Sequence, residues 1–337
     1  MAELVSRVML DAIEKEIVRQ GSFFRDKFFS TVYAIPERVF EYDRITYNSD
    51  SLPFAGYEAE STTDAVKGFD TVTASFECIR HKHVITPFEL ENRLPGRTAY
   101  DTAEKIAELQ NISYGELERA LIRTEEKMAI QALVEGQVTV KLADGSTKRL
   151  AQYWDTPITG GVNDPVITAS SWASATGADM LEDILGWQAK IIEKGGAAPN
   201  TLVVSADIGA KLARALMATP TALLNPGNVD AGARYDFEGI QYLGQFAGLS
   251  LYASGAALGG NPLMANGTAL LGSSSVSKMM YGPTYLPAGE QTMTRYIGRR
   301  SVYSIVSRDP VAIANVIQSA PLPLVRRKWD VLSIKGL

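Results

Sequence analysis

A stretch of helical periodicity from Thr98 to Gly136 constrains the fold of this 337-residue chain more than any other feature. Apolar residues recur there at three- and four-residue steps between Ala103 and Leu133, and charged residues occupy the other faces. Gly136 predicts the end of the helix, whereas Gly115 weakens its centre enough to allow a bend or a break. At about 1.5 Å per residue, the helix would span on the order of 50 Å, which is longer than a compact domain of this size needs.

Length and composition exclude several classes of protein. A chain of this length should form about two domains, and it contains no run of eighteen apolar residues that could cross a membrane. Its first twenty residues are interrupted by charges and lack the apolar core of a signal peptide. The net charge of −5 argues against a surface that grips nucleic acid through its phosphates, and the single cysteine, Cys78, suits a reducing cytoplasm.

The first third of the chain alternates between apolar and polar segments. Residues 1–20 have helical periodicity that ends at Gly21, and four phenylalanines follow within seven residues: Phe23, Phe24, Phe28 and Phe29. For a lone domain we expect a helix docked on its own core. Residues 41–72 are polar and rich in turn formers, so they read as a surface insertion or flexible loop. Ile79 to Ile85 predicts a strand that returns the chain to a core.

The second half predicts a mixed α/β region. Asp144-Gly145 marks a hairpin turn within Gln137 to Leu150, and a loop is expected from Asp155 to Ser171. A helix is expected from Ala178 to Lys194, then a strand from Thr201 to Ser205 and a second helix capped by Asp207. Short strands separated by glycines follow, at 240–243, 249–252, 269–271, 277–281, 301–306 and 312–317.

Residues able to carry chemistry are few. His81 and His83 would share one face of a strand, yet a third metal ligand would have to be Glu77 or Glu89, so we favour histidines on a polar surface. Cys78 reads as buried and inert. The carboxylate pairs Glu125-Glu126 and Glu182-Asp183 read as solvated helix faces. No nucleophile elbow or phosphate-binding loop occurs, so the sequence points away from catalysis and indicates no cofactor and no metal.

Two short blocks carry a family resemblance. In Asp309 to Leu324, DPVAIANVIQSAPLPL, a short strand must end before its prolines or lie on a sheet edge, because proline cannot donate to the ladder. In Arg80 to Gly96, RHKHVITPFELENRLPG, basic residues and histidines precede proline, leucine and arginine-leucine-proline. Both blocks resemble the major capsid proteins of lambda-like tailed phages (phage major capsid protein E family), in the same order along the chain.

The resemblance implies an α+β fold of the Hong Kong 97 type. It implies an N-terminal arm (residues 1–40), an extended loop (41–76), a peripheral domain (77–177 and 300–337, with a spine helix at about 98–136) and an axial domain (178–299). In such a subunit the four phenylalanines would anchor the arm partly on neighbours. Leu52, Phe54 and Tyr57 of the loop would also contact neighbours, as would Arg299 and Arg300. Arg299-Arg300 and the basic run at Arg326 to Lys328 could serve either nucleic acid or salt bridges to acidic neighbours.

The implied function is mechanical. Hexamers and pentamers of this chain would close into an icosahedral shell around phage double-stranded DNA, without specific DNA binding and without a membrane. The expected partners are a separate scaffolding protein, a portal and possibly a decoration protein; the expected locations are the virion and, during assembly, the host cytoplasm. We expect no large cleaved N-terminal domain and no covalent cross-links, since the loop offers Lys67 alone. The alternatives are an encapsulin-type nanocompartment shell and a two-domain α/β enzyme.

Overall fold

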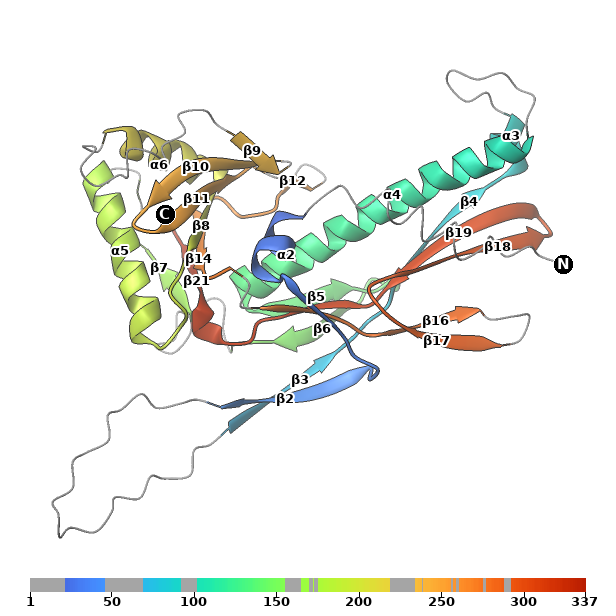
Figure 1. Ribbon diagram of the computed structural model, residues 1–337, viewed down its shortest axis with the longest axis horizontal. Coiled ribbons are helices and arrows are strands. Elements are labelled where there is room, and N and C mark those ends of the chain that lie inside the picture. Colours follow the sequence, from blue (N-terminus) through green and yellow to red (C-terminus); the bar gives the residue numbers. More distant parts are fainter. Residues whose placement is uncertain are drawn as a thin grey trace, which may run out of the picture.

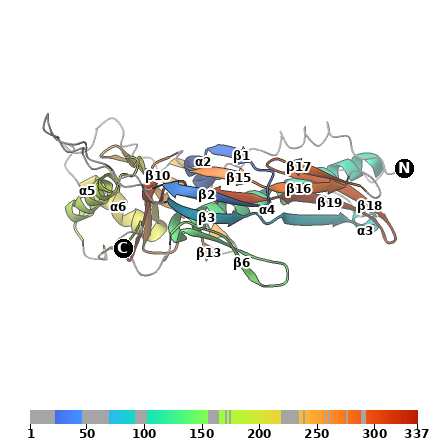
Figure 2. The same ribbon diagram turned by 90° about the horizontal axis from the view of Figure 1, so that it is seen from below.

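The structure is a computed structural model with two ends of different character, joined by one long helix (Figures 1 and 2). It describes residues 22–45, 69–91, 102–154, 165–169, 172, 175–218, 234–237, 239–255, 257–258, 261–274, 277–287 and 292–337. A mixed sheet with two helices forms one end, and small two- and three-stranded sheets follow the long helix to the other. Leu52, Phe54 and Tyr57 lie outside the described residues.

A seven-stranded sheet forms the first end, which we call the sheet body. Its strand order is β7 (Val166–Thr168), β21 (Val331–Lys335), β14 (Thr268–Gly272), β8 (Thr201–Ser205), β11 (Leu249–Ser254), β10 (Ile240–Phe246) and β9 (Arg234–Phe237). Helices α5 (Gly177–Glu193) and α6 (Ala206–Ala218) lie beside it. Every residue of β8 is buried, as expected of a central strand covered on both faces.

Helix α5 begins and ends where its sequence requires. Thr176 accepts a hydrogen bond from the backbone N–H of Asp179, whose carboxylate accepts one from the Thr176 N–H, so the two residues form a capping box. Met180, Ile184 and Ile191 face the core of the sheet body. The expected helix and strand from 178 to 205 are therefore confirmed. Asp207 lies in the first turn of α6, but its carboxylate accepts from the N–H of Gly267, so the expected cap on its own helix is wrong.

The long helix is α4 (Thr102–Ile130), which continues as a π-helical turn, η1 (Gln131–Glu135). It runs without interruption through Gly115, so the break considered there does not occur. It stops at Gly136, whose φ of +68° is left-handed; an added Cβ would lie 1.9 Å from the ring of Trp154. Glycine is needed at that position both for the turn and for the close packing of the indole.

Small sheets lie alongside α4, and together with it they form what we call the spine body. Strands β18 (Ser301–Arg308), β19 (Val311–Ser319) and β4 (Ile79–Ile85) make one sheet, against which α4 packs; α3 (Pro87–Glu91) follows β4. A second sheet has the order β1 (Thr31–Ala34), β15 (Lys278–Tyr281) and β20 (Pro321–Leu324). The prolines of IQSAPLPL thus lie in an edge strand that starts after β19 ends, as the sequence predicted.

Four two-stranded ribbons and two short helices complete the described part of the fold. The ribbons are β2 (Val39–Ile45) with β3 (Phe69–Ser75), β5 (Gln137–Lys141) with β6 (Thr147–Gln152), β12 (Ala257–Leu258) with β13 (Asn261–Pro262), and β16 (Pro283–Pro287) with β17 (Met293–Ile297). The short helices are α2 (Phe23–Phe28) and the 3-10 turn η2 (Lys328–Asp330). The hairpin expected around Asp144-Gly145 is confirmed as β5–β6.

Strand pairing moves three of the expected domain bounds. The loop expected at 155–171 contains β7, which pairs with β21. The expected peripheral domain includes β21, yet this strand lies inside the seven-stranded sheet of the sheet body. The expected axial domain includes β15, yet this strand pairs with β1 and β20 in the spine body. The chain therefore crosses between the two bodies more often than a division at 177 and 299 allows.

Candidate assembly surfaces and a buried charge cluster

Helix α2 is docked on its own chain. Phe23, Phe24, Phe28 and Phe29 are all buried in a hydrophobic cluster that joins the spine body to one face of the seven-stranded sheet, where Phe23 packs on the ring of Tyr252 of β11. Because no part of these side chains is left for a neighbour, their assignment as intersubunit contacts is wrong. The simpler interpretation of the sequence, a helix on its own core, holds for this segment.

A buried carboxylate on α4 ties α2 in place. The first backbone N–H groups of a helix lack partners within the helix, and Ser22, which precedes α2, makes no side-chain cap. The carboxylate of Glu126 accepts hydrogen bonds from the backbone N–H groups of Phe24 and Arg25, at 2.8 and 3.0 Å. Burial raises the pKa of Glu126 to about 7, against the two backbone hydrogen bonds, which lower it. Glu126 thus caps a helix that lies about a hundred residues away in sequence.

The preceding residue, Glu125, contacts two arginines and a tyrosine. Its carboxylate accepts from Arg25 at 2.9 Å and from the hydroxyl of Tyr281 at 3.2 Å, and Arg299 lies 3.8 Å away. Burial raises the pKa of Glu125, and the guanidinium groups of Arg25 and Arg299 oppose the shift. Burial and the nearby Glu125 charge also raise the pKa of Tyr281. The expectation that Glu125 and Glu126 form a solvated face is therefore wrong.

Arg299 and Arg300, which the sequence predicts as intersubunit contacts, are buried within the subunit to different degrees. Arg300 is buried and forms an ion pair with Glu118, which lies about two helical turns before Glu125 on α4. Its assignment as an intersubunit contact is wrong, because its charge is already neutralised inside the subunit. Arg299 keeps 29% of its side chain exposed and remains a candidate contact. The charges meet because α2 and the two residues before β18 come from distant segments to the same stretch of α4, which local sequence patterns do not reveal.

The β2–β3 hairpin projects from the spine body (Figure 1). Its base is anchored on one face by Phe40, Ala74 and Phe76, with the rings of Phe40 and Phe76 5.3 Å apart. The other face carries Glu41 and Asp43 and is exposed. At the base, Glu77 pairs with Lys148 and Arg38; the hydrogen bond from Lys148, ahead of the one from Arg38, lowers the pKa of Glu77.

Apolar side chains are exposed mainly on the spine body. On the β16–β17 ribbon, Tyr285, Met293 and Ile297 belong to one face, and Met293 is 81% exposed. At the far ends of β18 and β19, the exposed apolar residues are Ile305, Val306 and Val311. Large groups of exposed apolar side chains mark surfaces that meet other proteins. These strand ends are therefore candidate assembly surfaces.

The histidines and the cysteine form no catalytic or metal site among the described residues. No three His, Cys, Asp or Glu side chains of those residues lie close enough to hold a metal ion, and Glu89 is engaged by the backbone N–H of Thr86. Cys78 is exposed, so the expectation of a buried thiol is wrong, although desolvation by its surroundings raises the pKa of the thiol. None of the described helices is long and apolar enough to cross a membrane.

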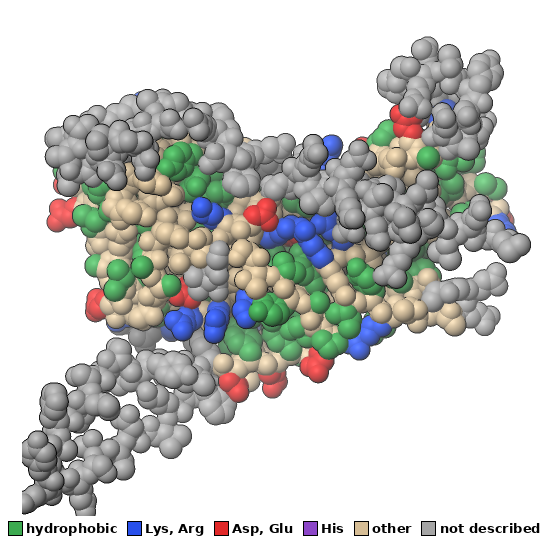
Figure 3. Space-filling model, in the orientation of Figure 1, with side chains coloured by type: hydrophobic (Ala, Val, Ile, Leu, Met, Phe, Trp, Pro, Cys, Tyr) green, Lys and Arg blue, Asp and Glu red, His purple; other side chains and the backbone are tan. Residues whose placement is uncertain are grey.

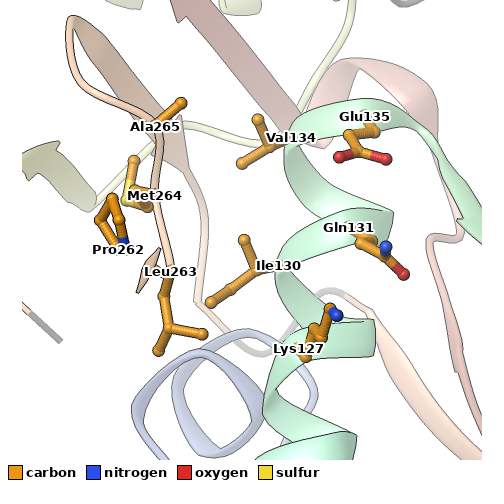
Figure 4. Close-up of a pocket in the computed structure, with 9 residues that line it drawn as sticks. All are labelled: Lys127, Ile130, Gln131, Val134, Glu135, Pro262, Leu263, Met264 and Ala265. Atoms are coloured by element: carbon orange, nitrogen blue, oxygen red, sulfur yellow. The ribbon is translucent and has the colours of Figure 1, made fainter. Parts of the chain in front are cut away.

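A pocket of about 470 Å³ lies between the end of α4 and the segment from Pro262 to Ala265 (Figure 4). Ile130 and Val134 point from the helix toward Leu263 and Met264, whereas Gln131 points away from them. Lys127 and Glu135 also line the pocket. With apolar walls and no pair of convergent polar groups, this pocket offers binding area but no acid-base chemistry.

The chain is similar to one protein family and to several solved structures. The model of the family described as phage major capsid protein E matches residues 6–335, whereas none of the curated proteins matches the chain. A solved structure of the putative capsid protein of a prophage of E. coli CFT073 is similar over 100% of both chains, with 13% identity and a TM-score of 0.67. The capsid of the cyanophage P-SCSP1u (13% identity, 94% and 88% covered, TM-score 0.52) and the mature capsid of bacteriophage PhiM1 (12%, 94% and 87%, 0.53) are also similar.

These likenesses show a Hong Kong 97-type α+β capsid fold, as the two sequence blocks implied. The long helix α4, the projecting β2–β3 hairpin and the seven-stranded sheet are its main parts here. The matched residues span nearly the whole chain, so the role of the protein is that of a structural capsid subunit. The chain belongs to the phage major capsid protein E family.

Proposed function

We propose that copies of this chain close, as hexamers and pentamers, into an icosahedral shell that encloses double-stranded DNA. The proposal builds on the structural capsid role that the family shows. It includes a location in the virion, assembly in the host cytoplasm, and help from a separate scaffolding protein and a portal. We further propose shells without covalent cross-links and without enzymatic activity.

The observation that carries the proposal is the β2–β3 hairpin. A two-stranded ribbon is marginally stable in water, and within the described part of the chain this one packs on its own subunit at its base, through Phe40, Ala74 and Phe76. Glu41 and Asp43 on its outer face accept hydrogen bonds from the opposite threonines, Thr73 and Thr71, rather than from another element. A neighbouring copy would stabilise the hairpin. Leu52, Phe54 and Tyr57, in the segment that connects β2 and β3, would be the apolar residues that contact this neighbour.

Loop replacement tests this proposal. Residues 48–67 are replaced by a short Gly-Ser turn, and the purified protein is compared with the full chain by circular dichroism and electron microscopy. We expect the fold to persist, because α4 and both cores form within one chain, and closed shells to be lost. The matched control replaces Asp144 and Ser146 at the tip of the exposed β5–β6 hairpin, where assembly should continue. Normal shells from the loop variant would show that the loop is an ordinary surface insertion.

The encapsulin-type alternative differs in what the shell contains. Shells purified with nuclease treatment should protect double-stranded DNA from digestion if the chain encloses a phage genome. Shells that hold a protein cargo and no nucleic acid would favour the nanocompartment. On a denaturing gel the shells should dissolve to single chains, and a ladder that survives boiling would contradict the absence of cross-links.

A further inference from the structure

Three exposed cations form a stripe along the outer face of α4. Arg119, Arg123 and Lys127 follow one another at four-residue steps, so they lie on one side of the helix, roughly 6 Å apart along its axis. All three are exposed, and Figure 3 shows Lys and Arg side chains gathered over this part of the molecule. We call them the α4 stripe.

The α4 stripe is not neutralised within the described part of the chain. No ion pair among the described residues involves Arg119, Arg123 or Lys127, whereas the inward cations Arg25 and Arg300 pair with buried carboxylates of the same helix. Like charges at four-residue steps repel each other and destabilise a helix, so the stripe by itself weakens α4. The same helix therefore buries Glu118, Glu125 and Glu126 and exposes Arg119, Arg123 and Lys127, with Glu116 as an exposed carboxylate beside them.

The surroundings of the stripe favour a polyanion over a protein partner. The centre of a protein interface is depleted of charge and rich in aromatic side chains. Around the stripe the exposed and half-exposed residues on α4 are Glu116, Ala120 and Thr124, with no aromatic side chain among them. Phosphates follow each other at about 3.4 Å along one strand of a duplex, so a cation every 6 Å meets about every second phosphate.

We propose that the α4 stripe is the surface on which this subunit meets the phosphate backbone of the enclosed nucleic acid. The inference rests on the proposed function for the identity of that nucleic acid. Contact through three cations is weak and independent of sequence, which suits a wall with a net charge of −5. A local basic surface of this kind is compatible with the overall acidity of the chain, which argues only against tight binding of nucleic acid.

Neutralising the stripe tests the proposal. The full chain, unassembled at low concentration, is titrated into a fluorescent 30-base-pair duplex at several salt concentrations from 25 to 200 mM. The triple variant Arg119→Gln, Arg123→Gln, Lys127→Gln should bind more weakly. Its plot of log K against log salt should be shallower by about 2.7, which is three phosphates at about 0.9 each. Between 50 and 200 mM salt, that difference in slope amounts to roughly a 40-fold smaller loss of affinity.

The control carries the same change of charge in scattered places: Lys141→Gln, Lys194→Gln, Arg308→Gln, each exposed and on a different part of the fold. It should keep the wild-type slope. An equal weakening in both triple variants would reduce the effect to net charge and overturn the proposal, as would a wild-type chain that does not bind the duplex at 25 mM salt. Tighter binding of polyglutamate than of DNA by the wild type would assign the stripe to an acidic protein segment instead.

Electron microscopy of the same variants separates this inference from the proposed function. Shells formed by the stripe variant, with less DNA retained per shell than in the wild type, support both. Shells that retain the wild-type amount of DNA overturn the stripe while the shell role stands. If neither triple variant nor the wild type forms shells, the proposed function fails, whereas the duplex titration still decides the stripe.

Discussion

The sheet body and the spine body of this subunit bury different chemistry. In the sheet body α5 and α6 cover one face of the seven-stranded sheet with an apolar core, and the buried carboxylate of Asp330, beside β21, accepts the N–H of Ala197. The spine body buries Glu118, Glu125, Glu126 and Arg300 beside its phenylalanines, and it exposes many of the large apolar side chains. A body that buries charge and exposes apolar surface is incomplete on its own. The difference indicates that the spine body is built to meet other copies.

Breaking the buried pair of the spine body should produce the largest effect. Glu118→Ala leaves the guanidinium of Arg300 buried without its counter-charge, which should lower the free energy of unfolding by about 3–5 kcal/mol. Glu116→Ala removes an exposed carboxylate two residues away on the same helix and should change stability by about 0.5 kcal/mol or less. Urea denaturation of unassembled protein measures both. Equal costs would mean that the pair contributes nothing beyond a surface charge.

The sheet body should respond to side-chain volume instead. Ile184 is fully buried on α5, so Ile184→Ala should cost about 3 kcal/mol through lost burial and the cavity that remains. The next residue, Leu185, is about half exposed, and Leu185→Ala should cost less than about 1 kcal/mol. Comparable losses at the two positions would show that α5 is not fixed against the sheet as described.

The spine body should also respond to pH through Glu126. Its pKa is raised from 4.5 to about 7, so the folded state holds a proton that the unfolded chain releases. The stabilisation is complete below pH 4.5 and is lost as the pH rises through 7. Between pH 5 and pH 8 the loss should be on the order of 1–3 kcal/mol, seen as falling protection of the α2 amides in hydrogen exchange.

Glu126→Gln is the matched test, because its side chain is neutral at every pH. The amide keeps one acceptor for the N–H groups of Phe24 and Arg25, so α2 should be held less tightly but with a shallower pH slope. The charges of Asp26 and Arg25, which act on the same carboxylate, remain in the variant. A slope as steep as in the wild type would place the titrating group elsewhere, with Glu125 next, since burial raises its pKa too.

Sequence patterns predicted the helices and strands better than the tertiary contacts between them. The end of the long helix at Gly136, the strand Ile79–Ile85 and the edge position of the prolines each follow from local rules of periodicity and backbone chemistry. The buried charges could not be predicted, because Glu125 and Glu126 look like a solvated pair until α2 and Arg299 are brought onto them from distant segments. The burial of the four phenylalanines likewise depends on the docking of α2. Contacts between segments a hundred or more residues apart do not produce a periodic pattern in the local sequence, so the sequence does not predict them.

The smallest expected effect compares the two bodies at a pair of equivalent glycines. Gly115 lies inside α4 and Gly186 inside α5, and a Cβ added to either would meet no atom within 4 Å. In the unassembled subunit Gly115→Ala and Gly186→Ala should each stabilise by about 0.5–1 kcal/mol, because alanine loses less backbone entropy in a helix. Equal gains would show that both helices are equally regular in solution. A gain at Gly186 alone would mean that α4 depends on flexibility at Gly115 that α5 does not need, and the uninterrupted spine helix would then be a feature of only part of the population.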